Sequence, residues 1–459
     1  MDNYQVIKRI RFSEDDIKHI IESTIPIRID TAIGKDNVVF KDVNFSGLEI
    51  IKSKFKSSLS FINCVFESPV ILNKVSSESE ISFNKCIFDK GVLLFNCNSN
   101  HISFSGCSLG SHITFDSTEC QKISIYKVEC SAIYVLSSIR STKIKEIELS
   151  EAVVNDVIKI EEIHNAHRIS FDSINASVIR YDSMLLTTSS EIKMSNINCD
   201  DLRFENSKLE VNSHIQVLQS QIKNLLYRNM VFNRGCKVLI ESNLIEGKLF
   251  IQQSVYNNCS IDFSTSDITH LSLDPELLKF LYDSNKITPI MSTDMPLERQ
   301  IETLKKLKSK FSGDSLYESE DIVFFFMKNK EYSYFLKSPE NSISKLKYLF
   351  FYIFGRYCFG WGVKLKQPLI TSMAVIIIFS MIYYFIYDMS SFVNKINFLQ
   401  VDYTGSFGAV LMSTVTFFGQ YTDIETELAL NAILHITEFI LGVLYITLLV
   451  GILIRKLVR

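Results

Sequence analysis

The chain has 459 residues, of which 47% are hydrophobic and 22% are charged, and its formal net charge is −3. This length predicts two or three domains, the apolar content excludes global disorder, and the slightly acidic balance argues against a dedicated nucleic-acid-binding protein. With only 16 Gly and 7 Pro, collagen-like and low-complexity chains are also excluded. The mean hydropathy is positive despite the charge, which indicates that apolar residues are concentrated in part of the chain.

The N-terminal residues have no apolar stretch of the kind found in secretory signal peptides, since the chain opens MDNYQVIKRIRFSEDD. We therefore expect this part of the protein to stay in the cytosol, where its cysteines would be reduced. Ser13, followed by acidic residues and then by Ile17, Ile20 and Ile21, predicts a capped amphipathic helix. Residues 1–36 are accordingly expected to cap the repeat domain that follows.

Residues 37–270 repeat a short pattern. The clearest copies are Leu59–Phe66, Ile81–Phe88 and Ile102–Leu109, whose starts are 22 and 21 residues apart, and weaker half-units lie between them. Alternating apolar and polar residues with many β-branched and aromatic side chains are typical of short strands, and a half-unit of 10 or 11 residues leaves no room for a crossover helix. The pattern predicts a cytoplasmic β-solenoid (β-helix), on the order of 50 Å long if its rungs lie about 4.8 Å apart.

Cysteines recur at one position of this repeat, at Cys64, Cys86 and Cys107, with Cys130 one turn further by count. They could form a metal or redox ladder, or an inward stack of small apolar side chains. We favour the stack, because a free cysteine behaves as a small hydrophobe and no CxxC pair or Cys/His cluster accompanies them. The histidines at 164 and 167 are interpreted as part of an exposed loop, so no metal is expected. The block as a whole resembles pentapeptide-repeat and related β-helical proteins.

Residues 271–346 are expected to form a helical linker. Pro296 suits a first helical turn, and apolar residues from Leu297 to Phe311 recur at helical spacing until Gly313 and Asp314 break the pattern. A second helix is predicted through Ile322–Met327. The lysines of the first helix could contact lipid headgroups or an acidic partner, or could simply lie on a solvated face.

Residues 347–459 predict a transmembrane domain with two spans. The segment 369–387 contains no charge, and the segment 428–454 contains only His435 and Glu438 as ionisable groups, so each is long and apolar enough to cross a bilayer. Cations precede the first span and follow the second, whereas the charged residues of the connection between the spans are mostly carboxylates. By the positive-inside rule, this is a multi-pass protein of the cell membrane with both termini in the cytoplasm.

The connection between the spans contains an apolar stretch, residues 405–416, that is too short to cross a bilayer and return. Irregular backbone at membrane depth is tolerated only where protein or water satisfies it. A short helix that dips into the membrane and returns as an extended strand would meet this condition if it lined an aqueous pore. We therefore predict a pore loop over residues 405–423.

Together, the span, the short helix, the run Thr414–Ile424 and the second span resemble the two-transmembrane pore-loop channels of the potassium-channel superfamily. The segment Phe359–Gly362 with Lys364 and Pro368 also resembles the approach to the first span in such channels when they are fused to β-helical domains. The resemblance implies a selectivity filter, an anionic outer mouth and glycine hinges for gating. The filter residues would be Thr416, Phe417, Phe418, Gly419 and Gln420, the mouth residue Asp423, and the hinges Gly442 and Gly451.

The filter departs from the TVGYG-type run of potassium channels, because it contains Gly419 alone and is about one residue short. The permeant ion is therefore left open between K⁺ and Na⁺. If this run forms the narrowest ring, the Thr416 hydroxyl and backbone carbonyls would contact the ion, while Phe417 and Phe418 would point back into protein. His435 and Glu438 lie three residues apart in the second span and could serve gating or packing.

These features predict a homotetrameric cation channel in the lipid bilayer, regulated by its cytoplasmic β-solenoid through an unidentified ligand or protein partner. The alternative is a membrane-anchored scaffold, in which the solenoid binds a partner and the spans only tether it. An enzyme is not expected, since the sequence has no P-loop, no G-x-S-x-G, no H-E-x-x-H and no Gly-rich dinucleotide turn. No cofactor is implied.

Overall fold

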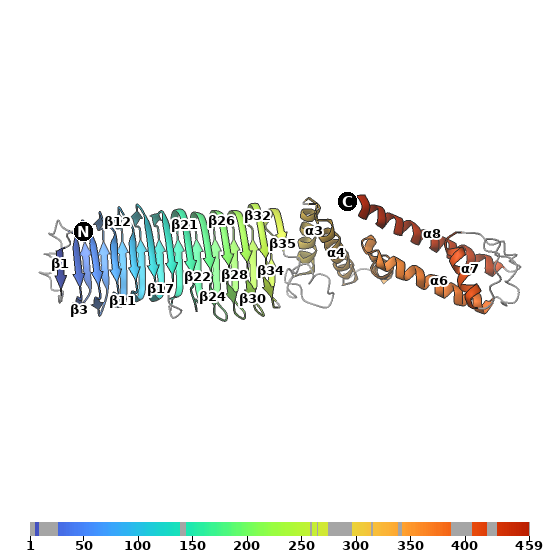
Figure 1. Ribbon diagram of the computed structural model, residues 1–459, viewed down its shortest axis with the longest axis horizontal. Helices are drawn as coiled ribbons and strands as arrows, with labels where there is room; N and C mark the ends of the chain where they lie inside the picture. The colour runs from blue at the N-terminus through green and yellow to red at the C-terminus, as the bar shows by residue number, and fades with distance from the viewer. Residues whose placement is uncertain are drawn as a thin grey trace. The chain divides into compact units, whose positions relative to one another are not determined.

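The computed structural model describes residues 5–8, 26–137, 144–257, 259–263, 265–273, 296–313, 315–337, 342–386, 406–419 and 429–458. The chain divides into two compact units near residue 306. The first unit is dominated by strands and the second consists of helices. Figure 1 shows the strands of the first unit stacked side by side in chain order.

The predicted β-solenoid is confirmed: it makes about 11 turns over residues 27–273, and each strand pairs in parallel with strands one turn earlier and one turn later. In the first turns, four strands per turn give the coil four sides, alternating longer strands with two-residue strands. Later in the coil, neighbouring short and long strands merge, with a register irregularity where they join, as between Val154 and Val157.

The coil has two faces of long strands, and the two-residue strands lie on the sides between them. One long-strand face comprises β2 (Ile27–Asp30), β6 (Leu48–Ile51), β10 (Val70–Asn73), β13 (Val92–Phe95), β16 (His112–Asp116), β19 (Ala132–Leu136), β21 (Val153–Glu161), β23 (Asn175–Asp182), β26 (Asn198–Glu205), β29 (Gln221–Arg228), β32 (Leu244–Gln252) and β35 (Asp267–Leu273). The other comprises β4 (Val38–Lys41), β8 (Leu59–Ile62), β11 (Ser76–Asn84), β14 (Asn98–Ser105), β17 (Glu119–Tyr126), β20 (Ile144–Ser150), β22 (Arg168–Asp172), β25 (Glu191–Ser195), β28 (His214–Leu218), β31 (Lys237–Glu241) and β34 (Ser260–Asp262). The two-residue strands are β3 (Ile33–Gly34), β5 (Asn44–Phe45), β7 (Lys54–Phe55), β9 (Val65–Phe66), β12 (Ile87–Phe88), β15 (Ser108–Leu109), β18 (Glu129–Cys130), β24 (Leu185–Leu186), β27 (Lys208–Leu209), β30 (Val231–Phe232) and β33 (Val255–Tyr256).

The sequence pattern recurs every 10 or 11 residues because the backbone turns a corner at that spacing, with one residue in the left-handed region at each corner. Through the first five turns these corners are Thr31, Asp42, Lys52, Asn63, Lys74, Lys85, Asn96, Gly106, Ser117 and Lys127, with φ between 50° and 62°. Only one of them is glycine, so the others are residues with a Cβ that adopt a positive φ, which is energetically unfavourable. Hydrogen bonds to the next turn hold the corners, for example from the Asn63 N–H to the Asn84 carbonyl at 2.8 Å.

Identical side chains stack inside the coil. The rings of Phe61 and Phe83 lie 4.9 Å apart and those of Phe83 and Phe104 lie 4.7 Å apart, in both cases nearly parallel. Further along, Tyr181, Phe204 and Tyr227 form a second stack with spacings of 4.8 and 4.9 Å. These spacings equal the separation of hydrogen-bonded strands, so the repeat length itself sets the aromatic contacts.

The inward stacking of Cys64, Cys86 and Cys107 is confirmed, because all three are buried and their neighbours pair in register. Each follows a left-handed corner, and its thiol lies near backbone carbonyls, as Cys64 Sγ does at 3.4 Å from the carbonyl oxygen of Phe40. The placement of Cys130 on this ladder is wrong. Ser108 pairs with Glu129, so the residue in register with Cys107 on the next turn is the buried Val128. Cys130 is in register with Leu109 instead.

The sequence also made predictions about the N-terminal cap and about the histidines at 164 and 167. The N-terminal helix around Ser13 lies outside the described residues, and the coil begins at Ile27, within the segment expected to be a cap; β1 (Gln5–Lys8) pairs with β2 there. His164 forms an isolated bridge with Leu185. The His167 ring lies 3.2 Å from the Thr187 hydroxyl. Within the described ranges, no three His, Cys, Asp or Glu residues gather as a metal site would need.

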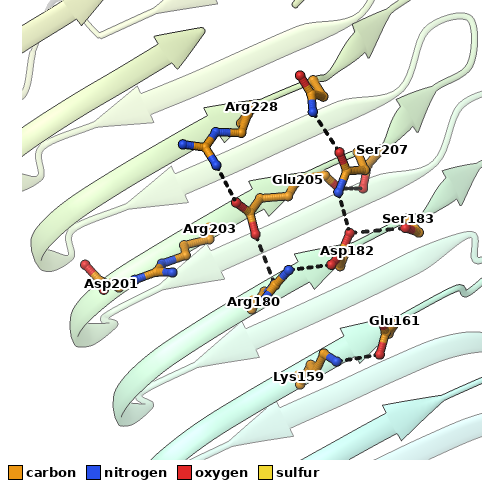
Figure 2. A network of polar contacts seen from close by, with 12 residues as sticks. Lys159, Glu161, Arg180, Asp182, Ser183, Asp201, Arg203, Glu205, Ser207 and Arg228 are labelled. Carbon is orange, nitrogen blue, oxygen red and sulfur yellow. Dashed lines mark hydrogen bonds and ion pairs between the residues drawn. The ribbon is translucent and has the colours of Figure 1, made fainter. Parts of the chain in front are cut away.

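The outer face of the later turns carries ladders of charge, shown in Figure 2. Arg180 Nη2 lies 2.6 Å from Asp182 Oδ2, and Arg180 Nε lies 3.0 Å from Glu205 Oε2 on the next turn. Arg228, one turn further, lies 3.8 Å from Glu205. Both carboxylates are buried beneath the arginines. Burial raises the pKa of Asp182, but hydrogen bonds from Asn206 and Ser183 and the charge of Arg180 outweigh it and lower the pKa overall.

The second unit is helical and contains helices over the segments where the sequence predicted them, together with further helical segments between α4 and α6. They are α3 (Leu297–Gly313), which begins in the first unit, α4 (Tyr317–Lys337), α5 (Ser342–Ile353), a π-helical segment η1 (Phe354–Cys358), a 3-10 turn η2 (Gly360–Gly362), α6 (Lys366–Ile386), α7 (Ser406–Phe417) and α8 (Ala429–Val458). Pro296 directly precedes α3, as predicted, and α4 contains the predicted Ile322–Met327. The lysines of α3 differ in surroundings: Lys305 is exposed, whereas Lys308 lies over the Phe324 ring at 5.1 Å.

Candidate functional site

Two helices are long and apolar enough to cross a membrane. The candidate spans are Lys366–Phe385, with 20 residues, and Ala432–Val458, with 27 residues. They lie where the sequence predicted spans at 369–387 and 428–454. At 1.5 Å per residue, both reach the roughly 30 Å thickness of the hydrocarbon layer.

Between them, α7 is a 12-residue apolar helix that packs against both α6 and α8. Its buried residues Ala409 and Met412 form a core with Phe379 and Tyr383 of α6, and Leu434 and Leu441 of α8 pack against this core. A helix of 12 residues is only about 18 Å long and cannot span a bilayer. The three helices therefore form one packed group, and α7 lies within the segment 405–423 for which a pore loop was predicted.

The centre of this group is a carboxyl group with no exposed surface, that of Glu438 on α8. Tyr383 on α6 donates its hydroxyl hydrogen to Glu438 Oε2 at 2.5 Å, and the Ser413 hydroxyl on α7 is hydrogen-bonded to Oε1. His435, one turn earlier on α8, stacks on the Tyr383 ring at 4.8 Å, with its Nδ1 3.2 Å from the Tyr383 hydroxyl. Glu438 thus ties all three helices together.

The hydrogen atoms available at this cluster can be counted. Ser413 Oγ lies within hydrogen-bond distance of both Glu438 Oε1 and the Ile376 carbonyl oxygen, at 2.8 Å from the latter. A serine hydroxyl has one hydrogen to donate and can accept from another donor. Both contacts are satisfied if the Glu438 carboxyl carries a proton and donates it to Ser413, which then donates to Ile376. This arrangement also leaves no unpaired charge inside the helix group.

Gly442 is the point of closest approach between α8 and α7. A Cβ placed on Gly442 would lie 1.9 Å from the Phe417 carbonyl oxygen, which is far inside van der Waals contact. At Gly451, in contrast, an added Cβ would meet nothing within 4 Å. Both glycines lie inside the continuous helix α8. Gly442 therefore permits helix contact in this structure, and a hinge role for either glycine stays a prediction.

The predicted filter begins at the end of α7. Thr416 is buried, and its hydroxyl lies 3.4 Å from Nδ1 of His435 on α8 of the same chain. Phe417 is buried, whereas Phe418 is 60% exposed in the single chain. Gly419 ends the helix with φ of +82°, a conformation that favours glycine. Gln420 and Asp423 lie outside the described residues.

Sequence reasoning singled out His435 and Glu438 but missed their partners. Tyr383 is one of two adjacent tyrosines in an apolar span, and Ser413 is one of several hydroxyl residues in the connecting segment. Nothing local distinguishes either from its neighbours, because the contacts bridge 55 and 25 residues. A buried carboxyl group in a span does predict that some partner exists.

A second set of contacts joins α4 to α8 and to the turn before α6. Asp321 of α4 pairs with Arg455, in the last turn of α8, at 2.6 Å. Asn329 of α4 accepts a 2.8 Å hydrogen bond from the Trp361 indole N–H, and Tyr332 stacks on the same indole at 4.8 Å. Trp361 holds a positive φ of 53°, unusual for a bulky residue. One helix thus contacts both the end of α8 and the turn that leads into α6.

No protein-family model, no curated protein and no solved structure matches the chain significantly.

Proposed function

We propose that the chain is one subunit of a homotetrameric channel for monovalent cations, K⁺ or Na⁺, in which α6 and α8 span the cell membrane and α7 is the re-entrant pore helix. Both termini would lie in the cytoplasm, and the solenoid would regulate opening through a ligand or partner. One chain supplies two spans and one short helix, so closed cyclic symmetry is the simplest way to complete a pore.

The observation that carries this proposal is the seating of α7 between α6 and α8. The helix is too short to span, yet Glu438 and Gly442 of α8 hold it by a buried hydrogen bond and by close backbone contact. Two helices that only anchored a solenoid would need no such insert. In a bilayer, the non-helical backbone after Phe417 would have to face protein or water, and a shared pore provides the water.

The end of α7 suits cations. The C-terminal end of a helix carries a partial negative charge from its unpaired carbonyls, which favours a cation nearby. The Phe417 carbonyl packs against Gly442 of α8, so the backbone carbonyls of residues 418–420 would line the narrowest ring. Asp423, repeated four times, would concentrate cations at the outer mouth. Since the Thr416 hydroxyl is directed to His435, we assign ion contact to the backbone carbonyls rather than to that hydroxyl.

The competing proposal is a membrane-anchored scaffold, with the solenoid as the binding surface and the spans as a tether. The two proposals differ in what residues 405–423 do. A scaffold tolerates any soluble linker between its two spans, whereas a channel does not.

The test is reconstitution of the full chain into liposomes under a potassium gradient. A channel passes a potassium current, and its reversal potential in mixed KCl and NaCl reports which ion it prefers. The matched control replaces residues 405–423 by a scrambled sequence of the same composition, which should abolish the current while both spans still insert. Equal and negligible currents from both chains would favour the scaffold.

A further inference from the structure

The helix α5, just before the first candidate span, has an apolar face that is exposed in the described part of the chain. Its ring contact there is between Phe350 and Phe354 of η1, at 4.3 Å. Leu346, Leu349, Phe350 and Ile353 follow the i, i+3, i+4, i+7 spacing of one helix stripe, and all four are exposed. Leu346 is 70% exposed and Phe350 is 56% exposed. Large apolar side chains exposed together mark a surface that something covers.

The opposite face of α5 is already occupied. Tyr348 stacks on Phe335 of α4 at 4.9 Å and contacts the ring of Tyr332 edge-on at 6.4 Å. This contact fixes how α5 is turned about its own axis. The apolar stripe therefore faces away from α4.

Positive charge flanks the stripe on both sides. At about 100° per residue, Lys345 and Lys347 lie about 100° to either side of Leu346 around the helix. Arg356, in η1, is hydrogen-bonded to the Tyr352 hydroxyl and lies over the Tyr352 and Tyr357 rings at 5.5 and 5.2 Å. Within the described ranges, no carboxylate is ion-paired with these three cations, and residues 342–366 contain no Asp or Glu at all.

From this arrangement we infer that the stripe of α5, together with Lys345, Lys347 and Arg356, is a binding surface for anionic lipid headgroups at the membrane interface. The apolar stripe lies at the boundary of the acyl chains, and the lysine stems extend sideways to the headgroups. Continuity with the first candidate span selects a lipid surface over a protein partner, because only 12 residues, 354–365, separate the end of α5 from the start of α6. The inference rests on α6 crossing a membrane and not on ion conduction.

The chain carries its own probe for this surface. Trp361 is the single tryptophan of the sequence, and it packs directly on η1, since a Cβ on Gly355 would lie 2.2 Å from its ring. The full chain is placed in nanodiscs of 80% phosphatidylcholine and 20% phosphatidylglycerol. Bromine is carried either by all of the phosphatidylglycerol or by an equal amount of phosphatidylcholine, so only the headgroup of the quencher differs.

We expect brominated phosphatidylglycerol to quench Trp361 fluorescence at least about twofold more than brominated phosphatidylcholine does. The reason is that each basic residue at an anionic surface contributes about 1 kcal/mol, or about fivefold in local affinity. The triple variant Lys345→Gln, Lys347→Gln, Arg356→Gln should bring the quenching ratio to one. Lys345→Arg with Lys347→Arg, which keeps the charge, should preserve the ratio. The matched control Lys52→Gln, Lys74→Gln, Lys85→Gln removes three charges at solenoid corners and should leave it unchanged.

A wild-type ratio of one would overturn the inference, as would a ratio that the triple variant leaves unchanged. Absence of quenching by either brominated lipid would also overturn it, because the turn would then lie away from the bilayer. None of these readouts requires a current. A chain that shows headgroup preference but conducts no ions would keep this inference and lose the channel proposal.

Discussion

At the scale of single residues, Glu438 holds α6, α7 and α8 together. Its carboxyl group is inaccessible to solvent and hydrogen-bonded to one hydroxyl on α6 and one on α7. Removing one member of a buried polar cluster leaves the others unpaired, which costs more than the bond itself contributes. The state in which the carboxyl is protonated also has a close uncharged mimic, the glutamine side chain.

We therefore predict that Glu438→Ala lowers the free energy of unfolding by about 2–4 kcal/mol, because a cavity and unpaired hydroxyls remain. Glu438→Gln should stay within about 1 kcal/mol of wild type. An SDS titration of the detergent-solubilised protein, followed by circular dichroism, measures both. Equal damage from Gln and Ala would show that a charged carboxylate, not a neutral carboxyl, holds α7.

Gly442 and Gly451 form a matched pair in one helix. Gly442→Ala must push α7 from α8, since its Cβ would meet the Phe417 carbonyl at 1.9 Å, and it should abolish most of the current and destabilise the helix group. Gly451→Ala meets no neighbour and should be neutral or stabilising by up to about 1 kcal/mol, from helix propensity alone. Liposome currents and SDS unfolding of both variants provide the comparison. Similar effects at the two positions would contradict the role given to Gly442.

At the scale of elements, periodicity explains what the sequence could predict. Strands of the solenoid and the two spans follow from patterns within 20 residues, which are legible without a structure. The stack of Cys64, Cys86 and Cys107 was predictable for the same reason. Cys130 was misplaced because the next turn keeps 21 residues and puts Val128 at the inward position. Contacts such as Tyr383 with Glu438 join distant segments and leave no local signal.

The charge ladder of the solenoid has a pH signature. The pKa of Asp182 is lowered on folding, so its contribution to stability is present above its ordinary pKa near 4 and is lost as pH falls through the lower folded value. The stability difference between wild type and Asp182→Asn should therefore shrink as pH drops from 7 toward 3. Thermal unfolding followed by the β-sheet signal measures it. A difference independent of pH would mean that the charge of Asp182 contributes nothing.

At the scale of the whole molecule, α4 is the element that would transmit a change to the pore of the proposed channel. It pairs with the end of α8 through Asp321 and Arg455 and holds the turn before α6 through Asn329 and Trp361. A ligand of the solenoid could open the pore only if it bound the open arrangement more tightly than the closed one. The ion pair between Asp321 of α4 and Arg455 of α8 is a contact that could differ between the open and the closed arrangement.

We predict that Asp321→Asn shifts the ratio of open to closed channels by about fivefold, which corresponds to about 1 kcal/mol, and leaves single-channel conductance unchanged. Arg455→Gln should give a similar shift, and the double variant should add little to either. Single-channel recording in planar bilayers reports both quantities. Additive shifts in the double variant would show that the two residues act independently.

In the proposed channel, α7 helices from four chains surround one axis within the membrane. Electron cryomicroscopy of the full chain in lipid nanodiscs would show whether they do. We expect four subunits with the C-terminal ends of α7 directed toward a common axis and residues 418–420 closest to it. Single, unassociated chains with α7 lying flat on the outer leaflet would contradict it.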